Sequence, residues 1–322
     1  MSKEKKVLLF CTGFFSYDKI IKKSLEKNGY QVTLFDERAF KGVIGKSLVR
    51  LGWRKLTQTK IKSYYKNIYD HLSPDYDFLL IVNPECITPE SIKLFRSKCS
   101  KVVIYMWDSF LNKPGAKSLI ESADKFFTFD PLDAETSNLI FKPLFFSSSY
   151  YNLVSYPELK YDISFVGTVH SDRYRIVKFL TKQFNSYVFF YCPGIFIYLY
   201  KRFIIKEIKN VKYKDVSFHS MSEKEVVDVI RNSKAVIDIS HPKQRGLTMR
   251  TLESLGAQKK IITSNQHVID YDFYNDSNFL IINDKISPES ITSFLRKEYI
   301  PTDQHTYEKY HVDQWVKDFI RD

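Results

Sequence analysis

Short apolar runs alternate with amphipathic stretches along the first half of the chain. The runs with the length and composition of buried strands are KVLLFCT, QVTLFDER, DFLLIVN, KVVIYMWD and KFFTFD. Helical periodicity is found in SYDKIIKKSLEKNG, which closes at Gly29, and in PESIKLFRSKC. Strands that alternate with helices predict a parallel sheet with both faces covered.

The pattern restarts after FFSSSYYNLVSYPELK, an irregular stretch rich in Ser and Tyr. Strand-like runs return in YDISFVGT, YVFFYC, AVIDIS, KKIITSN and FLIIN, with helix-like segments among them. The sequence therefore predicts an α/β protein of two tandem Rossmann-like, doubly wound domains, residues 1–155 and 156–302, facing a cleft. Residues 303–322 are predicted to form a C-terminal helix that packs back on the body. Ligands of open α/β sheets bind outside the carboxyl ends of the strands, so we expect the site there.

Composition narrows the class of protein and of partner. The 322 residues are 44% hydrophobic and 27% charged, which is typical of a folded chain. The formal net charge of +12 favours polyanions, so nucleic acid, phosphate-rich ligands and anionic membranes are all candidates. The four cysteines are scattered without a C-x-x-C pair, which argues against a zinc site and a disulfide framework and favours free thiols in a reducing cytoplasm.

Apolar runs in this sequence are too short for a signal peptide or a membrane span. The first run ends at Thr12, and the longest is interrupted by Pro193 and Gly194. We therefore expect a cytoplasmic protein, with at most peripheral contact to the inner face of the cell membrane.

The stretch HPKQRGLTMRTLESLGAQKK follows a strand and leads into a short helix, whose free N–H groups favour an anion. Thr248 could cap this helix or bind phosphate, Arg250 offers a bidentate donor, and Glu253 lies about one turn further on, suited to ribose hydroxyls. The alternative is structural: Thr248 only caps, Arg250 and Glu253 form a surface pair, and Gly256 ends the helix.

AVIDISHPKQRGLTMRTLESLGAQKKIITSN resembles the donor-binding segment of GT-B glycosyltransferases, in particular the CgeB-like group and its relatives in capsule and lipopolysaccharide gene clusters. YDISFVGTVHSDRYRIVKFL is similar to the opening of the second domain in the same family. The resemblance implies transfer of a sugar from a nucleotide-sugar, without a metal or other cofactor.

Carried over to this sequence, the resemblance implies that Glu253 binds the ribose and that the loop and helix start bind the diphosphate or sugar. The donor-site residues so expected are Gly167, Thr168, Arg173 or Arg175, Gly246, Thr248, Arg250 and Glu253. His241, which ends the strand beside the glycine loop, and Gln244 in that loop are expected at the donor site as well. Glycine is expected in the facing loop so that the backbone can approach the nucleotide. Arg245 stands where many retaining enzymes have a glutamate, so retention and inversion are both open.

Asp108 follows a strand in the first half, with Ser109 beside it. It is our candidate for the base that takes a proton from the acceptor hydroxyl, although it could instead cap the next turn. Gly13, Ser16 and Tyr17 form a second loop that could touch acceptor or donor, and for Ser16 a capping role is the alternative.

Histidines and D-x-D triplets give no metal site. His170, His219 and His241 have no metal-ligand spacing, and the DYD triplets at 75–77 and 270–272 fit turns better than the metal-binding motif of a GT-A enzyme.

Two basic, aromatic segments remain, residues 41–66 and 198–214. Each could lie on an anionic membrane with its cations among the headgroups, or pack its apolar side on a sheet.

These observations predict a metal-independent GT-B glycosyltransferase that moves a sugar, of hexosyl or related type, from a nucleotide-sugar to a growing surface polysaccharide or lipopolysaccharide. A lipid-linked acceptor is expected, because it would explain the two basic aromatic segments. The first domain would bind the acceptor and the second the donor. The alternatives are a nucleic-acid-binding or regulatory basic protein, for which no recognition motif is present, and a fold that binds a nucleotide-sugar without turning it over. The base, sugar, acceptor and oligomeric state are not specified.

Overall fold

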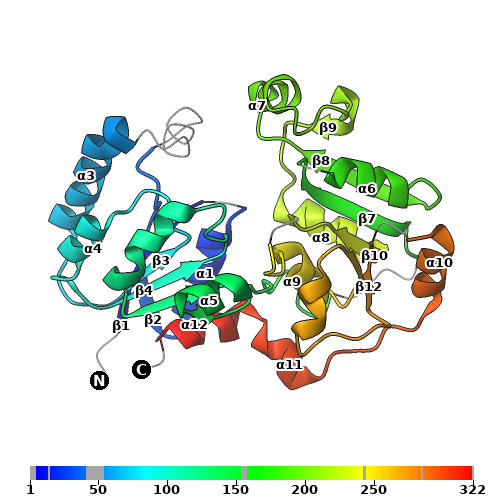
Figure 1. Ribbon diagram of the computed structural model, residues 1–322. Helices are drawn as coiled ribbons and strands as arrows, with labels where there is room; N and C mark the ends of the chain where they lie inside the picture. The colour runs from blue at the N-terminus through cyan, green and yellow to red at the C-terminus, as the bar shows by residue number, and fades with distance from the viewer. Residues whose placement is uncertain are drawn as a thin grey trace. The chain divides into compact units, whose positions relative to one another are not determined.

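The computed structural model describes residues 5–13, 15–40, 54–153, 158–170, 172–241, 244–283 and 286–320. These residues form two compact units (Figure 1): the first comprises residues 1–144 and 312–322, the second residues 145–311. The division therefore comes earlier in the chain than the expected residue 155. The last residues of the chain return to the first unit.

The first unit is built on a six-stranded parallel sheet in the order β2-β1-β3-β4-β5-β6. Its strands are β1 (Lys5–Cys11), β2 (Tyr30–Phe35), β3 (Tyr76–Val82), β4 (Cys99–Met106), β5 (Lys125–Thr128) and β6 (Ile140–Phe141). Its helices are α1 (Tyr17–Lys27), α3 (Arg54–His71), α4 (Pro89–Phe95), the 3-10 helix η1 (Pro114–Ser122), α5 (Pro131–Ser137) and α12 (Val312–Ile320).

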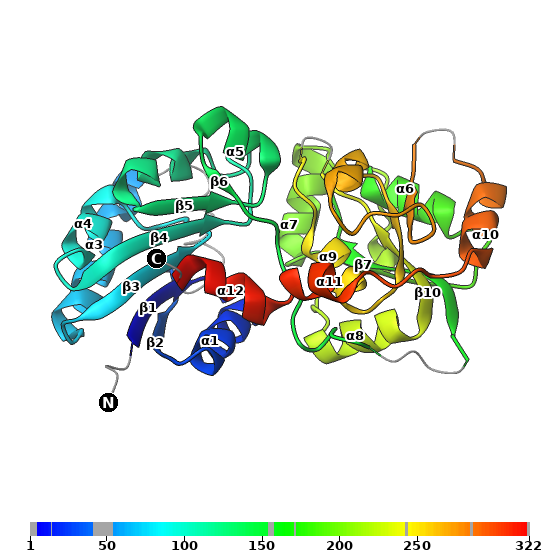
Figure 2. The same ribbon diagram turned by 90° about the horizontal axis from the view of Figure 1, so that it is seen from below.

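Helices cover both faces of this sheet (Figures 1 and 2). Alternate strand residues such as Leu8 and Phe10 form one core with α3 and α4. On the opposite face Tyr105 meets Trp315 of α12 edge-on, with ring centroids 4.8 Å apart. The indole of Trp315 also donates to the Pro143 carbonyl at 2.9 Å, so α12 is fastened to the first unit by both packing and a hydrogen bond.

The second unit contains another six-stranded parallel sheet, in the order β12-β11-β10-β7-β8-β9. Its strands are β7 (Tyr161–Thr168), β8 (Ser186–Tyr191), β9 (Val216–Ser217), β10 (Ser233–Asp238), β11 (Lys260–Thr263) and β12 (Phe279–Ile281). Its helices are α6 (Arg173–Leu180), α7 (Ile195–Leu199), η2 (Tyr200–Ile204), η3 (Tyr213–Asp215), α8 (Glu223–Arg231), α9 (Met249–Gly256), η4 (Gln266–Asp270), α10 (Pro288–Arg296) and α11 (Gln304–Lys309).

Both sheets are doubly wound, and each has one point where the strand order reverses. In the first unit the chain runs from β1 outward to β2 and then crosses to β3 on the other side of β1. In the second unit it runs from β7 through β8 and β9 and then crosses to β10. Ligands of such sheets bind at these switch points. The loops after β1 and β3 and those after β7 and β10 are therefore expected to form the binding sites.

The expected C-terminal helix is divided into α11 and α12, and only α12 belongs to the first unit. All four cysteines are buried free thiols. Within the described ranges, no helix combines the length and the apolar character needed to cross a bilayer.

Candidate functional site

Arg173 connects the ends of β7 and β10 at the switch point of the second unit. Its Nη1 donates to the Thr168 carbonyl at the end of β7, and its Nε donates to the Ile239 carbonyl after β10, both at 2.9 Å. Burial lowers the pKa of Arg173 to about 10, while the charge of Asp238 acts in the opposite direction. The side chain is therefore a partly buried cation that links two strand ends, and part of its hydrogen-bonding capacity is already used.

Gly167 is explained by packing around this arginine. A Cβ atom at this position would lie 2.9 Å from the Phe165 ring and 3.2 Å from Nη1 of Arg173. The first of these distances is too short for real atoms, so a larger residue would displace the ring. Close approach of a nucleotide, the reason expected from the sequence, stays a prediction.

Arg175, the other arginine considered for this loop, lies apart from the strand ends on the surface of α6. Its side chain is 69% exposed and pairs with Asp172 at 3.5 Å. The structure thus favours Arg173 as the arginine of the switch point.

His170 and His241 follow β7 and β10, and their ring centroids are 5.8 Å apart. Burial, reinforced by the charges of Arg173 and Lys201, lowers the pKa of His170 to about 3, so its imidazole is neutral at pH 7. His170 Nδ1 is buried and has no hydrogen-bond partner among the described residues. In the sequence, the spacing of the histidines only argued against a metal site. That His170 lies at the switch point beside His241 became visible only in the folded structure.

The loop between β10 and α9 is held by its own side chains and by the loop after β11. Gln244 Nε2 donates to the Gly246 carbonyl at 2.9 Å. Asn265 Nδ2 donates to the carbonyls of Arg245 and Gly246 at 3.1 and 3.3 Å. No pattern in the sequence singles out Asn265, because only the fold brings it next to this loop.

Asp238, at the end of β10, anchors the first turn of α9. Its Oδ2 accepts from Thr248 Oγ1 at 2.8 Å and from Thr251 Oγ1, and the aspartate is only 4% exposed. Thr248 is the N-cap of α9, where Oγ1 accepts from the Thr251 N–H at 3.3 Å. The structure therefore shows Thr248 in the capping role, and phosphate binding by its hydroxyl stays a prediction.

Arg250 and Glu253 form an ion pair on α9, with Nη1 and Oε2 2.7 Å apart. The expected alternative was a surface pair, but the side chains are only 18% and 6% exposed. Tyr150 lies against both, and burial raises its pKa well above the usual value, with Glu253 adding to the shift and a hydrogen bond with Arg250 opposing it. Arg250 also lowers the pKa of Arg173, so the pair lies close to the switch point.

Gly256 ends α9, as the structural alternative expected, and it also has a packing role. A Cβ here would lie 2.5 Å from the ring of Phe146. The Gly256 carbonyl accepts from the Tyr307 hydroxyl at 2.5 Å. The missing side chain thus lets the segment around Phe146 pack directly on the helix that carries Arg250 and Glu253.

In the first unit, Asp108 lies after β4 and is held by two neighbours. Asn83 Nδ2 donates to Asp108 Oδ2 at 3.0 Å, and Lys113 Nζ lies 3.4 Å from the same oxygen. Among the described residues no backbone N–H donates to Asp108, so the capping alternative is wrong. With 39% of its side chain exposed, Asp108 is accessible for proton transfer, whereas Ser109 is only 4% exposed.

The loop after β1 differs in detail from its expected roles. Gly13 is exposed, and Ser16 is the N-cap residue of α1, with φ of 63° and no side-chain capping bond. Ser16 therefore occupies the N-cap position that the alternative expected, but its hydroxyl makes no capping hydrogen bond. Tyr17 is 9% exposed and packs against Trp107, with ring centroids 6.2 Å apart.

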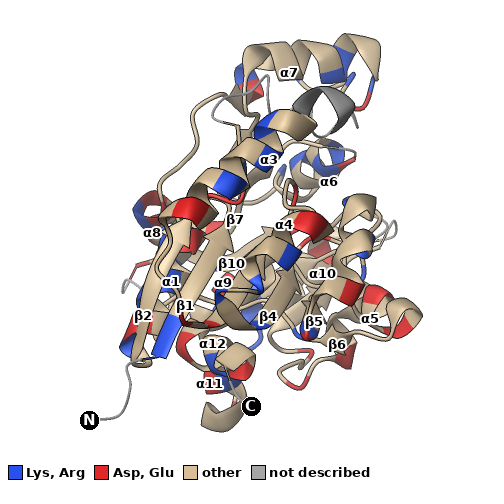
Figure 3. Ribbon diagram, turned by 90° about the vertical axis from the view of Figure 1, so that its left-hand side faces the viewer, with Lys and Arg blue, Asp and Glu red and all other residues tan. Residues whose placement is uncertain are grey.

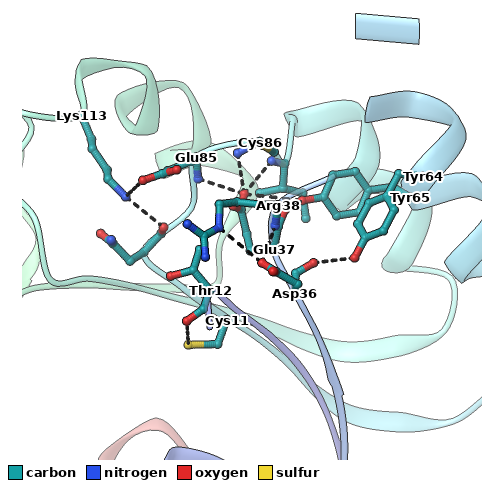
Figure 4. A network of polar contacts seen from close by, with 12 residues as sticks. Cys11, Thr12, Asp36, Glu37, Arg38, Tyr64, Tyr65, Glu85, Cys86 and Lys113 are labelled. Carbon is teal, nitrogen blue, oxygen red and sulfur yellow. Dashed lines mark hydrogen bonds and ion pairs between the residues drawn. The ribbon is translucent and has the colours of Figure 1, made fainter. Parts of the chain in front are cut away.

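Glu37, which belongs to a strand-like run in the sequence, organises the switch point of the first unit (Figure 4). It is fully buried, and its Oε1 accepts from the N–H groups of Glu85, Cys86 and Ile87 at 2.9, 2.6 and 2.8 Å. Burial raises the pKa of Glu37 to about 7, although these bonds and Lys113 oppose the shift. Lys113 in turn pairs with Glu85 at 2.8 Å, so the carboxylate fixes the loop that supports Asp108.

The remaining candidates have structural contacts. Asp77 accepts from the Lys6 N–H at 2.7 Å, and Asp272 accepts from the Tyr310 hydroxyl and Lys309, both at 2.6 Å. His219 is exposed, and its N–H donates to Ser217 Oγ at 3.2 Å. In the described part of the chain no three His, Cys, Asp or Glu side chains are grouped so that they could hold a metal ion.

Comparison with known proteins identifies the fold. No family model and no curated protein matches the sequence, whereas solved structures match along nearly the whole chain. AviGT4, a glycosyltransferase involved in avilamycin A biosynthesis, is 10% identical, with 98% of this chain and 96% of that chain covered and a TM-score of 0.55. HepE from Anabaena in complex with UDP-glucose is 10% identical, with 98% of each chain covered and a TM-score of 0.58.

A third similar structure is the N-terminal domain of trehalose-6-phosphate phosphatase from Candida albicans, 9% identical, with 99% of this chain and 97% of that chain covered and a TM-score of 0.56. At these identities the likeness is one of fold. The predicted α/β fold of two tandem Rossmann-like domains, as in GT-B proteins, is confirmed. Because the third protein is named for a different activity, the reaction has to be argued from the site.

Proposed function

We propose that the protein is a glycosyltransferase that takes a sugar from a nucleotide-sugar bound to the second unit. The observation that carries this proposal is the Arg250–Glu253 pair on α9, beside the carboxyl end of β10. A guanidinium can bind diphosphate oxygens in bidentate fashion, and a carboxylate can accept from both ribose hydroxyls. The solved HepE complexes with UDP and UDP-glucose support the proposal through their common fold.

Burial of the pair shapes how such a ligand would bind. Glu253 is 6% exposed and bonded to Arg250, so ribose can take its carboxylate only if Arg250 receives another anion. A nucleoside diphosphate supplies that anion together with the ribose. A nucleoside alone would leave Arg250 without a carboxylate partner at low exposure, which is costly. We therefore propose that the donor site requires both parts of the ligand.

The experiment is a thermal-shift titration of the full chain with UDP, GDP, CMP and dTDP, with the matching nucleosides as controls, in the presence and absence of EDTA. A ligand that binds only the folded state raises its stability by mass action. We expect a rise with one diphosphate that EDTA does not remove, and a much weaker rise with its nucleoside. Glu253→Gln keeps the volume of the side chain and should weaken binding of that diphosphate about tenfold.

A flat response to every nucleotide, together with salt-sensitive binding to DNA or RNA, would contradict the proposal and favour a nucleic-acid-binding protein. A response that needs a divalent cation would contradict the metal-independent form of the reaction. Unchanged affinity in Glu253→Gln would remove the assigned ribose contact.

Asp108 of the first unit is proposed to take the proton from the acceptor hydroxyl. Asn83 and Lys113 both contact Oδ2, which orients the carboxylate, and the group is partly exposed. The proposed acceptor is a lipid-linked surface glycan, presented at the inner face of the cell membrane. The +12 net charge supports contact with such an anionic surface.

A further inference from the structure

The second unit has an apolar surface on α7 and η2, residues 195–205. Seven of the fifteen large hydrophobic side chains exposed in the described ranges fall in this short segment. They are Ile195, Phe196, Leu199, Tyr200, Phe203, Ile204 and Ile205. Scattered single exposures need no explanation, but such a cluster on a folded domain marks an interaction site.

Five of these side chains share one side of the helical segment, which we call the α7–η2 face. Phe196, Leu199, Tyr200, Phe203 and Ile204 are spaced by three, one, three and one residues, the spacing of a single helical face. Phe196 is 83% exposed, Ile204 69% and Phe203 62%. These side chains therefore project outward together.

Tyr198 and Arg202 of this segment are directed inward instead, and Lys201 is held in an ion pair. Tyr198 is 2% exposed, and its hydroxyl donates to the Val211 carbonyl at 2.8 Å. Arg202 donates to the same carbonyl and to the Tyr198 hydroxyl. Lys201 pairs with Glu207 at 3.1 Å. An amphipathic helix on a water-soluble domain has the reverse arrangement, with apolar groups inside and charges outside.

Lysines flank this face. Four lysines beside it are exposed: Lys206, Lys209, Lys212 and Lys214. The single acidic residue within 195–214 is Glu207, and it is paired with Lys201. Figure 3 shows the α7 segment as largely tan, with few charged positions along it. The surface thus presents apolar side chains at its centre and cations beside them, which matches the acyl chains and anionic headgroups of a bilayer surface.

We propose that the α7–η2 face inserts into the surface of an anionic lipid bilayer. The inference deepens the proposed function, since it rests on an acceptor that is lipid-linked, and it names the element that makes the contact. A second copy of the chain is the other occupant to consider. A net charge of +12 on each copy opposes that association and favours an anionic surface.

The inward cations refine what the sequence suggested. One of the two arrangements left open for residues 198–214 places their cations among headgroups, but Lys201 and Arg202 are engaged within the unit. Insertion of the apolar side chains and attraction of the flanking lysines to anionic lipid are therefore both needed for binding. The other basic segment, residues 41–66, lies partly outside the described residues and contributes nothing to this inference.

The test is flotation of the full chain with vesicles of phosphatidylcholine, with and without phosphatidylglycerol. We expect the chain to float with the anionic vesicles. The double variant Phe196→Ser/Phe203→Ser should lower partitioning about tenfold or more, because it removes two inserted rings. Ile204→Ser should lower it less, and Ile269→Ser, which removes a 55% exposed isoleucine from η4, should leave it unchanged.

A separate readout shows whether the ring enters the lipid. In Phe196→Trp the new indole should shift its emission to the blue on anionic vesicles and not on phosphatidylcholine alone. Wild-type flotation by the double variant would overturn the proposal, as would a concentration-dependent dimer that the double variant abolishes. Nucleotide titration of the wild type and the variants separates the membrane contact from the donor site. If the wild-type chain binds nucleotide but does not bind vesicles, only the membrane contact is refuted.

Discussion

Replacement of Glu37 by glutamine should change how the stability of the first unit depends on pH. The carboxylate is fully buried and accepts three backbone N–H bonds through Oε1, while burial raises its pKa from 4.5 to about 7. The folded chain therefore holds a proton on Glu37 more tightly than the unfolded chain does. Stability from this group is fully present below pH ~4.5 and is lost as pH rises through about 7.

The magnitude follows from the two pKa values of Glu37. A difference of one pH unit between them corresponds to about 1.4 kcal/mol, so ionisation of Glu37 should lower the free energy of unfolding by about 3 kcal/mol on the alkaline side. The linkage relation places about 2 kcal/mol of this loss between pH ~5.5 and ~8.5. A glutamine at this position would keep an oxygen to accept the three N–H bonds and cannot ionise. Relative to wild type, the Glu37→Gln variant should therefore gain about 2 kcal/mol across that interval.

Urea unfolding followed by tryptophan fluorescence measures the free energy of unfolding of the first structural unit. All three tryptophans, at positions 53, 107 and 315, fall within the residue ranges of the first unit. Glu121→Gln, at an exposed glutamate of the same unit, is the matched control and should leave the pH dependence of wild type in place. If Glu37→Gln and wild type lose stability in parallel between pH ~5.5 and ~8.5, a proton on Glu37 near neutral pH is refuted.

Further changes test the second unit and the proposed reaction. Gly256→Ala places a Cβ 2.5 Å from the Phe146 ring and should destabilise the second unit by about 1–3 kcal/mol, measured by calorimetry; an unchanged transition would refute the packing role. Arg173→Lys cannot reach both strand ends and should cost about 1–3 kcal/mol in the same assay, whereas an equally stable variant would show that the tie is dispensable. Asp108→Asn should slow sugar transfer about a hundredfold or more while the nucleotide Kd stays the same, and a fully active variant would exclude Asp108 as the base.

The sequence by itself determined the architecture and the α9 segment with its cap and its charged pair. Apolar runs that alternate with helical periodicity predicted two doubly wound sheets, because strand and helix periods are local properties that survive without any knowledge of contacts. The α9 segment was found in the same way. Its cap, Thr248, and its pair, Arg250 and Glu253, are separated by single turns, so their proximity is a property of one helix.

Tertiary structure decided which side chains are buried, and with that what each can do. In the sequence, Glu37 is only a polar residue at the end of a strand. In the structure, the loop after β3 directs three N–H groups to its carboxylate. Gly256 is an ordinary helix end until Phe146 packs on it. Residues 198–214 have the pattern of a basic amphipathic segment, and only the fold directs Arg202 inward and Phe196 of the preceding turn outward. Burial and orientation depend on groups distant in the chain, and no local pattern encodes them.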